Sequence, residues 1–341
     1  MQGASAHYSI PTNCGSIQQM PGIATFECKG NMSVSRRNGS GNIFGSSPDI
    51  YFQHKITGVT KEILLEWLSS LNDENEKNIS DCYPSMGIFK YGEFAEFIFL
   101  TCEKFKLSDE VRYLAVELFD RFMNKHTEEL YQHILTSIKN KKKKYWHIVQ
   151  ERMQKQILLR ISSCCQIASK LTSHYKVIIN SQIRNFLSEF DLNYSTESIL
   201  QSEIRVLKTL NYEVSTASPV TSLEIILEIL GFEFPDLDIK ILHMISVKIM
   251  DLVYLEHKTA YHQLFKRVTG QQHFTESERE KFLSVTNNKM FLVVSLIAAA
   301  TYIIDKTSTD KIIDRLCMIT SIPMEDIVDF TVIHLQRISK V

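Results

Sequence analysis

The sequence has no excess of charge of either sign, because 38 lysines and arginines face 39 aspartates and glutamates. A nucleic-acid binder needs a surplus of basic side chains, so any such role would have to depend on a local patch. Cysteine is also sparse, and the seven residues show neither CxxC spacing nor the density of a disulfide scaffold. We therefore predict reduced thiols and expect the adjacent Cys164 and Cys165 to fill a core.

The sequence has no hydrophobic run long enough for a single membrane span. The longest one, residues 290–304, falls short of the roughly 18 residues that a span requires and predicts a buried helix. The N-terminus has no basic start followed by an apolar run, so no signal peptide is predicted. Glycine-rich phosphate loops, GxSxG, HExxH and Cys-His metal spacings are missing as well. We expect no catalytic residue, metal site, cofactor or small-molecule substrate.

Glycine is rare beyond the start of the chain, since seven of the twelve glycines and three of the seven prolines lie within the first 50 residues. This part has no sustained hydrophobic period, which predicts a disordered tail over residues 1–56. Apolar residues then recur at helical spacing from Thr57 to Leu71, predicting a short helix within a segment, residues 57–84, that includes a linker. Beyond it, no alternating stretch or Asn-Gly hairpin favours a sheet.

The remaining sequence has helical periodicity in two parts of similar length. In the first part, residues 158–171 are apolar nearly all round, as in the central helix of a bundle. Ser218 followed by Pro219 is a strong helix-start signal, so we predict a domain boundary there. The second part has candidate helices at about 220–230, 239–257, 258–268, 289–304, 308–319 and 324–338.

Three segments resemble a cyclin box. KLSDEVRYLAVELFDRFM at 106–123 resembles its first two helices, and the spacing matches without a gap. QIASKL at 166–171 resembles the third helix, and ILQSEIRVLKTLNYEV at 199–214 resembles the fifth. The resemblance implies an all-α fold of two consecutive cyclin-like five-helix bundles, preceded by the disordered tail and the short helix. The N-terminal cyclin box would occupy residues 85–214 and the C-terminal cyclin-like domain residues 218–341.

The full pattern is similar to that of one subgroup of the family, the cyclin N-terminal domain-containing proteins. It includes LLRISSCCQIASKL, SEIRVLKTLNYEV and, at residues 250–265, MDLVYLEHKTAYHQLF. Members of this subgroup are associated with the maturation of meiotic crossovers in germ cells. The resemblance implies a nuclear protein of meiotic chromosomes that is not an enzyme, with the cytoplasm as a second location.

Five positions identify a cyclin box: an Arg in the first helix, an Asp that ends the second, a Leu and a Lys on the third, and a Glu on the fifth. Four of them are occupied as in the family, by Asp120, Leu159, Lys170 and Glu203. Tyr91 stands where the family has its Arg, and Lys90 stands where it has the preceding Met. We expect Asp120, beside Arg121, to serve the fold together with Leu159. A buried carboxylate needs donors, so Asp120 should accept from Tyr91, another cation or backbone amides.

The matched residues imply a kinase-binding surface. In the family, the third and fifth helices hold the αC helix of a kinase, whose glutamate must pair with a lysine for activity. By resemblance, Lys170 and Glu203 would approach each other at the centre of this surface, with Leu171 and Tyr212 as apolar neighbours. The family often has Phe followed by two Glu where this chain has Leu171 and Thr172-Ser173. The alternative that Lys170 and Glu203 are ordinary exposed helical charges stays open.

Residues 124–156 form an insertion between the second and third cyclin-box helices, and its middle is strongly basic. Such a cluster is typical of a nuclear-import signal or a phosphate-binding patch, and a solvated loop between extended helices is a further alternative. Adjacent like charges repel, so residues 139–144 should be exposed and poorly ordered. The cluster consists of Lys139, Lys141, Lys142, Lys143 and Lys144.

Three functions compete. The leading one is a non-catalytic regulatory subunit that binds a cyclin-dependent kinase, with other meiotic recombination proteins as further partners. The alternative is a cyclin-fold interaction scaffold at recombination sites that activates no kinase. The third is a nucleic-acid-binding cyclin fold like those of general transcription factors. The near-neutral chain gives the third little support, so direct nucleic-acid binding is not expected, and neither is a membrane partner.

Overall fold

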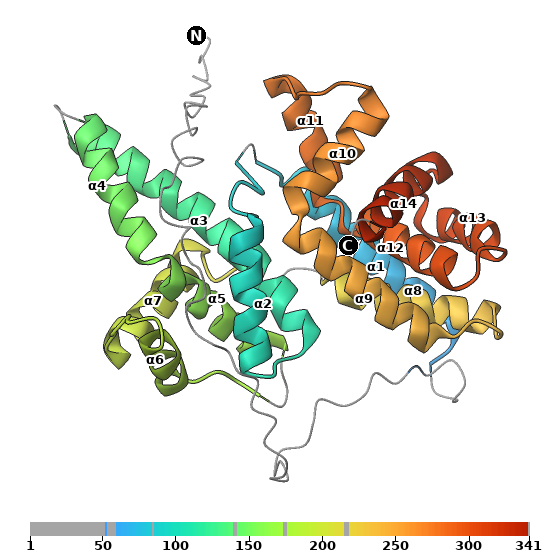
Figure 1. The fold of residues 1–341 in the computed structure, drawn as a ribbon, viewed down its shortest axis with the longest axis horizontal. Coiled ribbons are helices and arrows are strands. Elements are labelled where there is room, and N and C mark those ends of the chain that lie inside the picture. The colour runs from blue at the N-terminus through green and yellow to red at the C-terminus, as the bar shows by residue number, and fades with distance from the viewer. Residues whose placement is uncertain are drawn as a thin grey trace. The chain divides into compact units, whose positions relative to one another are not determined.

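Every regular element in the described part of the chain is a helix, which confirms the predicted all-α fold (Figure 1). The computed structural model describes residues 52, 59–83, 85–138, 142–172, 176–214 and 218–339. Apart from Phe52, the predicted disordered tail lies outside the described residues. All described residues belong to one compact unit, residues 45–341, within which the helices form two groups. The predicted domain limits therefore stay predictions.

The first group surrounds one apolar helix, α5 (Ile157–Thr172). Eleven of its sixteen residues are buried, including Cys164 and Cys165, which confirms the core role predicted for both thiols. Burial on all sides is what the apolar pattern of residues 158–171 predicts. Around α5 lie α2 (Gly92–Lys104), α3 (Asp109–Ser137), α6 (Asn180–Ser188) and α7 (Thr196–Thr209).

The predicted insertion is a helical hairpin. α3 continues to Ser137, and α4 (Lys142–Lys155) returns along it, so that both extend beyond the other helices of this half (Figure 1). The Tyr131 and Trp146 rings join the two helices edge to face, 5.2 Å apart. The prediction of poor order is wrong for the exposed lysines of residues 142–144, because helix propensity and packing on α3 outweigh their repulsion. Residues 139–141 lie outside the described residues.

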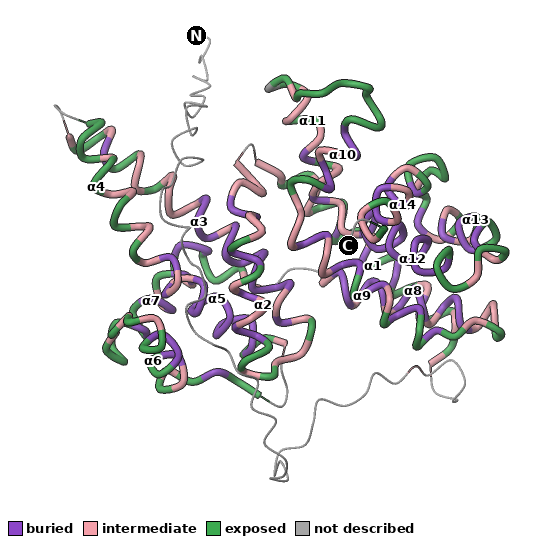
Figure 2. The backbone as a smooth tube through the Cα atoms, in the orientation of Figure 1, coloured by how far each residue is buried: buried purple, intermediate pink, exposed green. Residues whose placement is uncertain are grey.

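The second group repeats the arrangement around α12 (Lys289–Ile304). Twelve of its sixteen residues are buried, which confirms the predicted buried helix (Figure 2). Around it lie α8 (Pro219–Glu233), α9 (Ile239–Leu255), α13 (Thr309–Thr320) and α14 (Met324–Ile338). Ser218 caps α8 by accepting from the Val220 amide at 3.3 Å, as the sequence predicts.

Two more helices, α10 (His257–Thr269) and α11 (Glu276–Asn287), follow α9 and precede α12 in the sequence. α11 was not predicted, because few of its residues are buried and its apolar stripe is weak. The signal that could have found it is the capping box of Thr275 and Glu278. Among the described helices, none alone is long and apolar enough to span a membrane; α11 and α12 meet that test only as a pair bent by 64°.

The helix that precedes the cyclin box, α1 (Lys61–Ser80), extends beyond the predicted end at Leu71. It packs on α8, α11 and α12, so the N-terminal helix belongs with the second group. The Asn75 side chain donates to Asn288 at 3.0 Å and accepts from the Lys289 amide at 3.0 Å. Asn75 therefore supplies a partner at the start of α12, where helix amides lack intrahelical acceptors.

Candidate functional site

Lys170 and Glu203 meet, as the cyclin-box pattern implies. Lys170 lies in the last turn of α5 and its Nζ donates to Oε1 of Glu203 in the middle of α7. The Glu203 side chain is only 7% exposed, whereas that of Lys170 is 44% exposed. Glu203 is therefore not an ordinary solvated charge. The pair presents a half-exposed ammonium group anchored by a buried carboxylate.

Small buried residues allow α5 and α7 to approach closely enough for this pair. The hydroxyls of Ser163 and Ser202 lie 2.7 Å apart in the interior between the two helices. Ile199 and Val206, at positions that share a helix face with Ser202, are fully buried on the same side of α7. α7 thus packs through one face, and Glu203 lies at the edge of that face.

Exposed apolar side chains lie on the segments that follow Lys170 and Glu203 in the chain. The predicted Leu171 and Tyr212 are 46% and 64% exposed. Two further exposed apolar residues, Val177 and Ile179, were not predicted, because the α5–α6 connection has no hydrophobic period. This connection is fixed beside the end of α5, since the Ile178 amide donates to the Ser169 hydroxyl at 3.1 Å. Exposed apolar residues clustered around a polar centre are typical of a protein-binding surface.

Tyr212 is held in an uncommon backbone conformation. Asn211 and Tyr212 have φ values of 53° and 62°, so α7 ends with two consecutive left-handed residues. The Tyr212 amide donates to the Leu207 carbonyl at 2.8 Å, which closes the helix end. A left-handed tyrosine costs roughly 1–2 kcal/mol relative to a right-handed one, and such strain is concentrated at functional sites.

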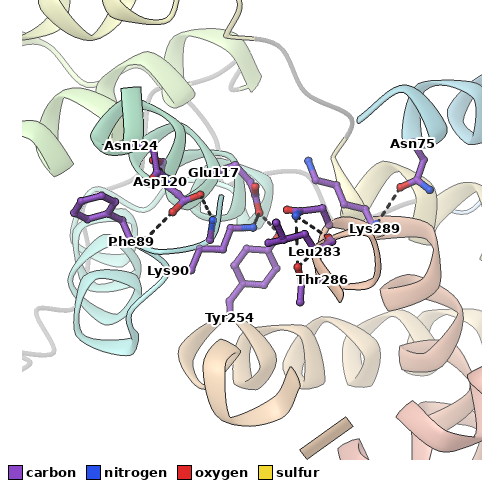
Figure 3. A network of polar contacts seen from close by, with 12 residues as sticks. Asn75, Phe89, Lys90, Glu117, Asp120, Asn124, Tyr254, Leu283, Thr286 and Lys289 are labelled. Carbon is purple, nitrogen blue, oxygen red and sulfur yellow. Dashed lines mark hydrogen bonds and ion pairs between the residues drawn. The ribbon is translucent and has the colours of Figure 1, made fainter. Parts of the chain in front are cut away.

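Asp120 has the structural position that the sequence predicts. It is buried, and its two oxygens accept from the amides of Gly87 and Phe89, both at 2.8 Å (Figure 3). Backbone amides are one of the three kinds of donor that we expected. Gly87 has a φ of 79°, which glycine adopts without strain. Burial raises the pKa of Asp120, despite the opposing effects of the nearby Lys90 charge and the amides.

The other two structural residues also lie within the fold. Arg121 donates from Nη2 to the Glu213 carbonyl at 2.7 Å and so ties α3 to the segment after α7. Leu159 is buried in α5, near its N-terminal end. Arg121 thus holds a helix end in place, and Leu159 contributes to the core of the first group.

A buried ion pair was not predicted. Nζ of Lys90 donates to Oε1 of Glu117 at 2.8 Å, and both side chains are almost fully buried (Figure 3). Tyr254 of α9 donates to the same carboxylate at 3.3 Å. Burial alone would raise the pKa of Glu117, but the Lys90 charge and hydrogen bond lower it to about 2. An acidic residue inside the apolar stripe of α3, one turn before Asp120, is the signal that could have revealed this pair.

Tyr91, at the position of the family's Arg, contributes to the contact between the two groups of helices. Nζ of Lys258 from α10 lies over the Tyr91 ring, 3.1 Å from its centroid, and donates to the Ile88 carbonyl at 3.1 Å. Nearby, the Tyr113 hydroxyl of α3 donates to Asp251 of α9 at 2.6 Å. These contacts fix the first group against the second.

The basic cluster lies away from the Lys170–Glu203 pair. Its described lysines begin α4, which packs mainly on α3. Lys142 donates to the Leu135 carbonyl of α3 at 2.9 Å, and Lys143 and Lys144 are exposed. Among the described residues, no group of His, Cys, Asp and Glu is arranged to hold a metal ion.

Comparisons with known proteins agree with this geometry. The family described as cyclin, N-terminal domain, matches residues 91–215. Cyclin N-terminal domain-containing protein 1 of Mus musculus is 32% identical over 275 residues, which cover 80% of this chain and 82% of the mouse protein. Its Homo sapiens counterpart is 30% identical over 80% of this chain and 83% of the human protein. This chain belongs to the cyclin N-terminal domain-containing protein 1 family. The predicted resemblance is confirmed.

Membership of a cyclin family bears on the kind of function but does not define it. The cyclin fold is regulatory rather than catalytic and works through contacts with other proteins. The cyclin N-terminal domain match begins at Tyr91 and includes Lys170, Leu171, Glu203 and Tyr212. The candidate site is therefore wholly inside the cyclin box.

Proposed function

We propose that this chain is a non-catalytic, cyclin-like regulatory subunit that binds a cyclin-dependent kinase and acts in the nucleus in the maturation of meiotic crossovers. The kinase would bind the face formed by Lys170, Leu171, Glu203 and Tyr212, which we call the α5–α7 face. The proposal is carried by the Lys170–Glu203 pair, in which a buried carboxylate holds a half-exposed ammonium group, together with the exposed Leu171 and Tyr212. The role in meiotic crossovers depends on the family resemblance.

The pair suits the backbone of a partner helix. An ammonium group has three donors, and Glu203 accepts one of them from Lys170, which leaves others for backbone carbonyls. The buried carboxylate restrains the lysine before a partner arrives, so less side-chain entropy is lost on binding. Leu171 and Tyr212 would exclude water around these polar contacts, as the apolar parts of strong interfaces do.

The apolar contribution differs from the usual family pattern. Leu171 offers less aromatic area than the Phe that is frequent there, but Val177 and Ile179 add exposed apolar surface from the α5–α6 connection. A kinase helix of matching shape would gain contacts with these two residues that the pattern of the cyclin box alone does not describe. This supports a partner preference specific to the chain, with meiotic recombination proteins as further partners.

The test is co-purification of tagged protein from meiotic tissue, with the kinase identified and assayed for phosphotransfer. Lys170→Glu places two carboxylates together at the centre of the face. Disrupting a central pair costs about 2 kcal/mol or more of binding, so kinase recovery should fall roughly thirtyfold or further. Lys311→Glu makes the same charge change at an exposed position of α13 and should leave recovery unchanged. Circular dichroism verifies that both variants fold.

Tyr212→Gly separates binding from folding more sharply. Glycine adopts the left-handed conformation without strain, so the variant should fold at least as stably as the wild type while it loses the exposed ring. We expect kinase recovery to fall with stability maintained. If Lys170→Glu and Tyr212→Gly both recover as much kinase as the wild type does, this face is not the kinase site. A recovered kinase without phosphotransfer activity would favour the interaction-scaffold alternative.

A further inference from the structure

Positive charge is concentrated in one short part of a nearly neutral chain. Residues 138–160 contain eight lysines and arginines and one acid, Glu151, which gives them a net charge of +7. Because the whole chain has a net charge of −1, the remaining residues together carry −8. The eight cations are Lys139, Lys141, Lys142, Lys143, Lys144, Arg152, Lys155 and Arg160.

The described cations of this segment follow the outer helix of the hairpin into α5. None of the α4 side chains described is buried, and its fourteen residues span about 20 Å. The first turn of α4 has three lysines and no acid, although a helix N-terminus favours negative charge. The repulsion in this turn is offset if an anion lies beside it.

The base of the hairpin holds two arginines without an acidic partner. Arg160 of α5 donates to the Ser202 hydroxyl at 2.7 Å and to the Gln156 side chain at 3.0 Å, both neutral acceptors. No described carboxylate forms an ion pair with Arg160 or with the exposed Arg205 of α7. Four of the other described arginines pair with acids: Arg112 with Asp251, Arg267 with Asp329, Arg315 with Glu233 and Arg337 with Glu256.

The surroundings of these arginines are positive throughout. Burial lowers the pKa of Arg160, and the charge of Arg205 lowers it further. His126 of α3 stacks on Phe122, and its Nδ1 is buried without a hydrogen-bond partner among the described residues. Burial and the charges of both arginines lower the pKa of His126 to about 4, so it is neutral at physiological pH. An anion between the arginines would relieve their repulsion.

The arginines continue the basic track of α4. The Tyr194 hydroxyl donates to the Lys155 carbonyl at the end of α4, at 3.2 Å. Burial raises the pKa of Tyr194, and the nearby Arg160 charge acts against this rise. Tyr194 is thus a neighbour of both the end of α4 and Arg160, so the described cations of α4 and the two arginines lie in adjoining parts of the fold.

We propose that α4 and the Arg160–Arg205 pair bind the sugar–phosphate backbone of a nucleic acid, with one phosphate held between the two arginines. Guanidinium groups bind phosphate through paired hydrogen bonds, and Arg160 is already oriented by its neutral partners. A single phosphopeptide group would need only the arginine pair. A track of about 20 Å instead matches an extended polyanion, whose binding without base contacts carries no sequence preference.

This surface is separate from the α5–α7 face. Arg205 follows Glu203 by two positions, so the two side chains leave α7 about 200° apart around its axis. One protein could therefore bind a kinase and a nucleic acid at the same time. Variants of Arg205 should leave kinase recovery unchanged, which makes the two proposals separately testable.

Fluorescence anisotropy with the purified full chain and a labelled duplex of about 20 base pairs tests the proposal. We expect wild-type affinity to fall steeply as salt rises from about 50 to 200 mM. Arg205→Ala should weaken binding at least about threefold and reduce the slope of log affinity against log salt by about one. A triple variant, Lys144→Glu, Lys155→Glu and Arg205→Glu, should abolish binding. Lys311→Glu, which lowers the net charge by 2 at an exposed site elsewhere, should have little effect.

Two further probes define the ligand. A single strand of equal length distinguishes duplex from single-stranded nucleic acid, and tighter binding of either one supports the proposal. A phosphothreonine peptide of neutral sequence tests the competing partner class. The proposal is overturned if the folded triple variant binds the duplex as well as the wild type does. It is also overturned if only the phosphopeptide binds in an Arg205-dependent way.

Discussion

The two halves of the molecule use one packing design with different surface chemistry. Their central helices, α5 and α12, each have sixteen residues, and the seventh residue of each is a buried serine. Ser163 bonds to Ser202 of α7, and Ser295 bonds to His334 of α14 at 2.9 Å. In each half, therefore, an apolar central helix forms the core, and a buried serine of that helix makes a polar contact with the last helix of the same half.

The halves differ where the central helix reaches the surface. The fourteenth residue is Lys170 in α5 but Tyr302 in α12. Lys170 pairs with the buried Glu203, whereas Tyr302 and Ile303 present partly exposed apolar side chains, with Lys306 over the Tyr302 ring at 5.4 Å. The ion pair at this end thus belongs to the first half. The two halves share their helix packing, and the ion pair of the candidate kinase site is a feature of the first half.

The inserted helices differ in the same way. α4 lies between the second and third helices of the first half and has no buried side chain among those described, whereas α10 and α11 occupy the corresponding place in the second half. α10 buries Tyr261 and Phe265 among others. One insertion remains available for partners, and the other contributes to the core (Figure 2).

The largest effect on stability is expected from the buried ion pair of the first half. Lys90→Met leaves the Glu117 carboxylate buried without its cation, which should lower the free energy of unfolding by about 3–5 kcal/mol. Urea denaturation measures the loss. Removing both charges in Lys90→Met with Glu117→Met should restore much of it.

A matched control uses an ion pair of the second half. Lys61 pairs with Glu233 at 2.6 Å, but its side chain is 37% exposed, so Lys61→Met should cost less than about 1 kcal/mol. Equal losses for Lys90→Met and Lys61→Met would mean that the Lys90–Glu117 pair is not sealed from water.

A smaller effect should appear in the pH dependence of the second half. Burial lowers the pKa of His334 from 6.5 to about 3. Below pH 6.5 the unfolded chain therefore gains a proton that the folded chain does not, and the free energy of unfolding falls as pH falls. At pH 5 this amounts to about 2 kcal/mol. His334→Gln should remove that part of the loss between pH 7 and pH 5, as measured by urea denaturation at both values.

Replacing His334 also changes the free energy of unfolding by an amount that does not depend on pH. Comparing the difference between pH 7 and pH 5 in the two proteins removes this amount. If the pH profile of His334→Gln is the same as that of the wild type, His334 takes up a proton in the folded protein as readily as in the unfolded chain. Its burial beside Ser295 would then not hold in solution.

The smallest effect on stability is expected from the insertions. Replacing the lysines of residues 139–144 with Gln should move a tagged protein from nucleus to cytoplasm, because the proposed import signal is removed. The melting temperature should change by no more than about 2 °C, since the described lysines of the cluster are exposed. Gln at Lys266 and Lys281 in the second insertion is the control. Unchanged localisation would rule out an import role for the cluster.

Local patterns predicted much of the fold. The central helices α5 and α12 are apolar on nearly every face, and the start of α8 at Ser218 and Pro219 has a specific chemical signature. α11 was missed because it buries few residues, and the order of α4 was missed because its packing partner, the far end of α3, is itself part of the insertion. A hydrophobic period in the sequence indicates a buried helix face, and α4 and α11 bury few side chains.

The candidate site was predictable only where the family pattern covers it. Lys170 and Glu203 were placed correctly because their positions are matched residue by residue. The Lys90–Glu117 pair, the exposed Val177 and the arginines of the hairpin base arise from contacts between residues far apart in the chain, which no local pattern encodes.

The contact of Asn75 with the start of α12 also constrains how the protein is made. The two partners are 213 residues apart, so at a synthesis rate of about 5–20 residues per second α1 waits roughly 10–40 s for α12. During that time Leu64, Leu68 and Leu71, which α1 buries in the finished protein, have no completed surface to cover them. α1 is thus a target for chaperones while the first half can already fold, and its buried face is covered fully only after α12 has been made.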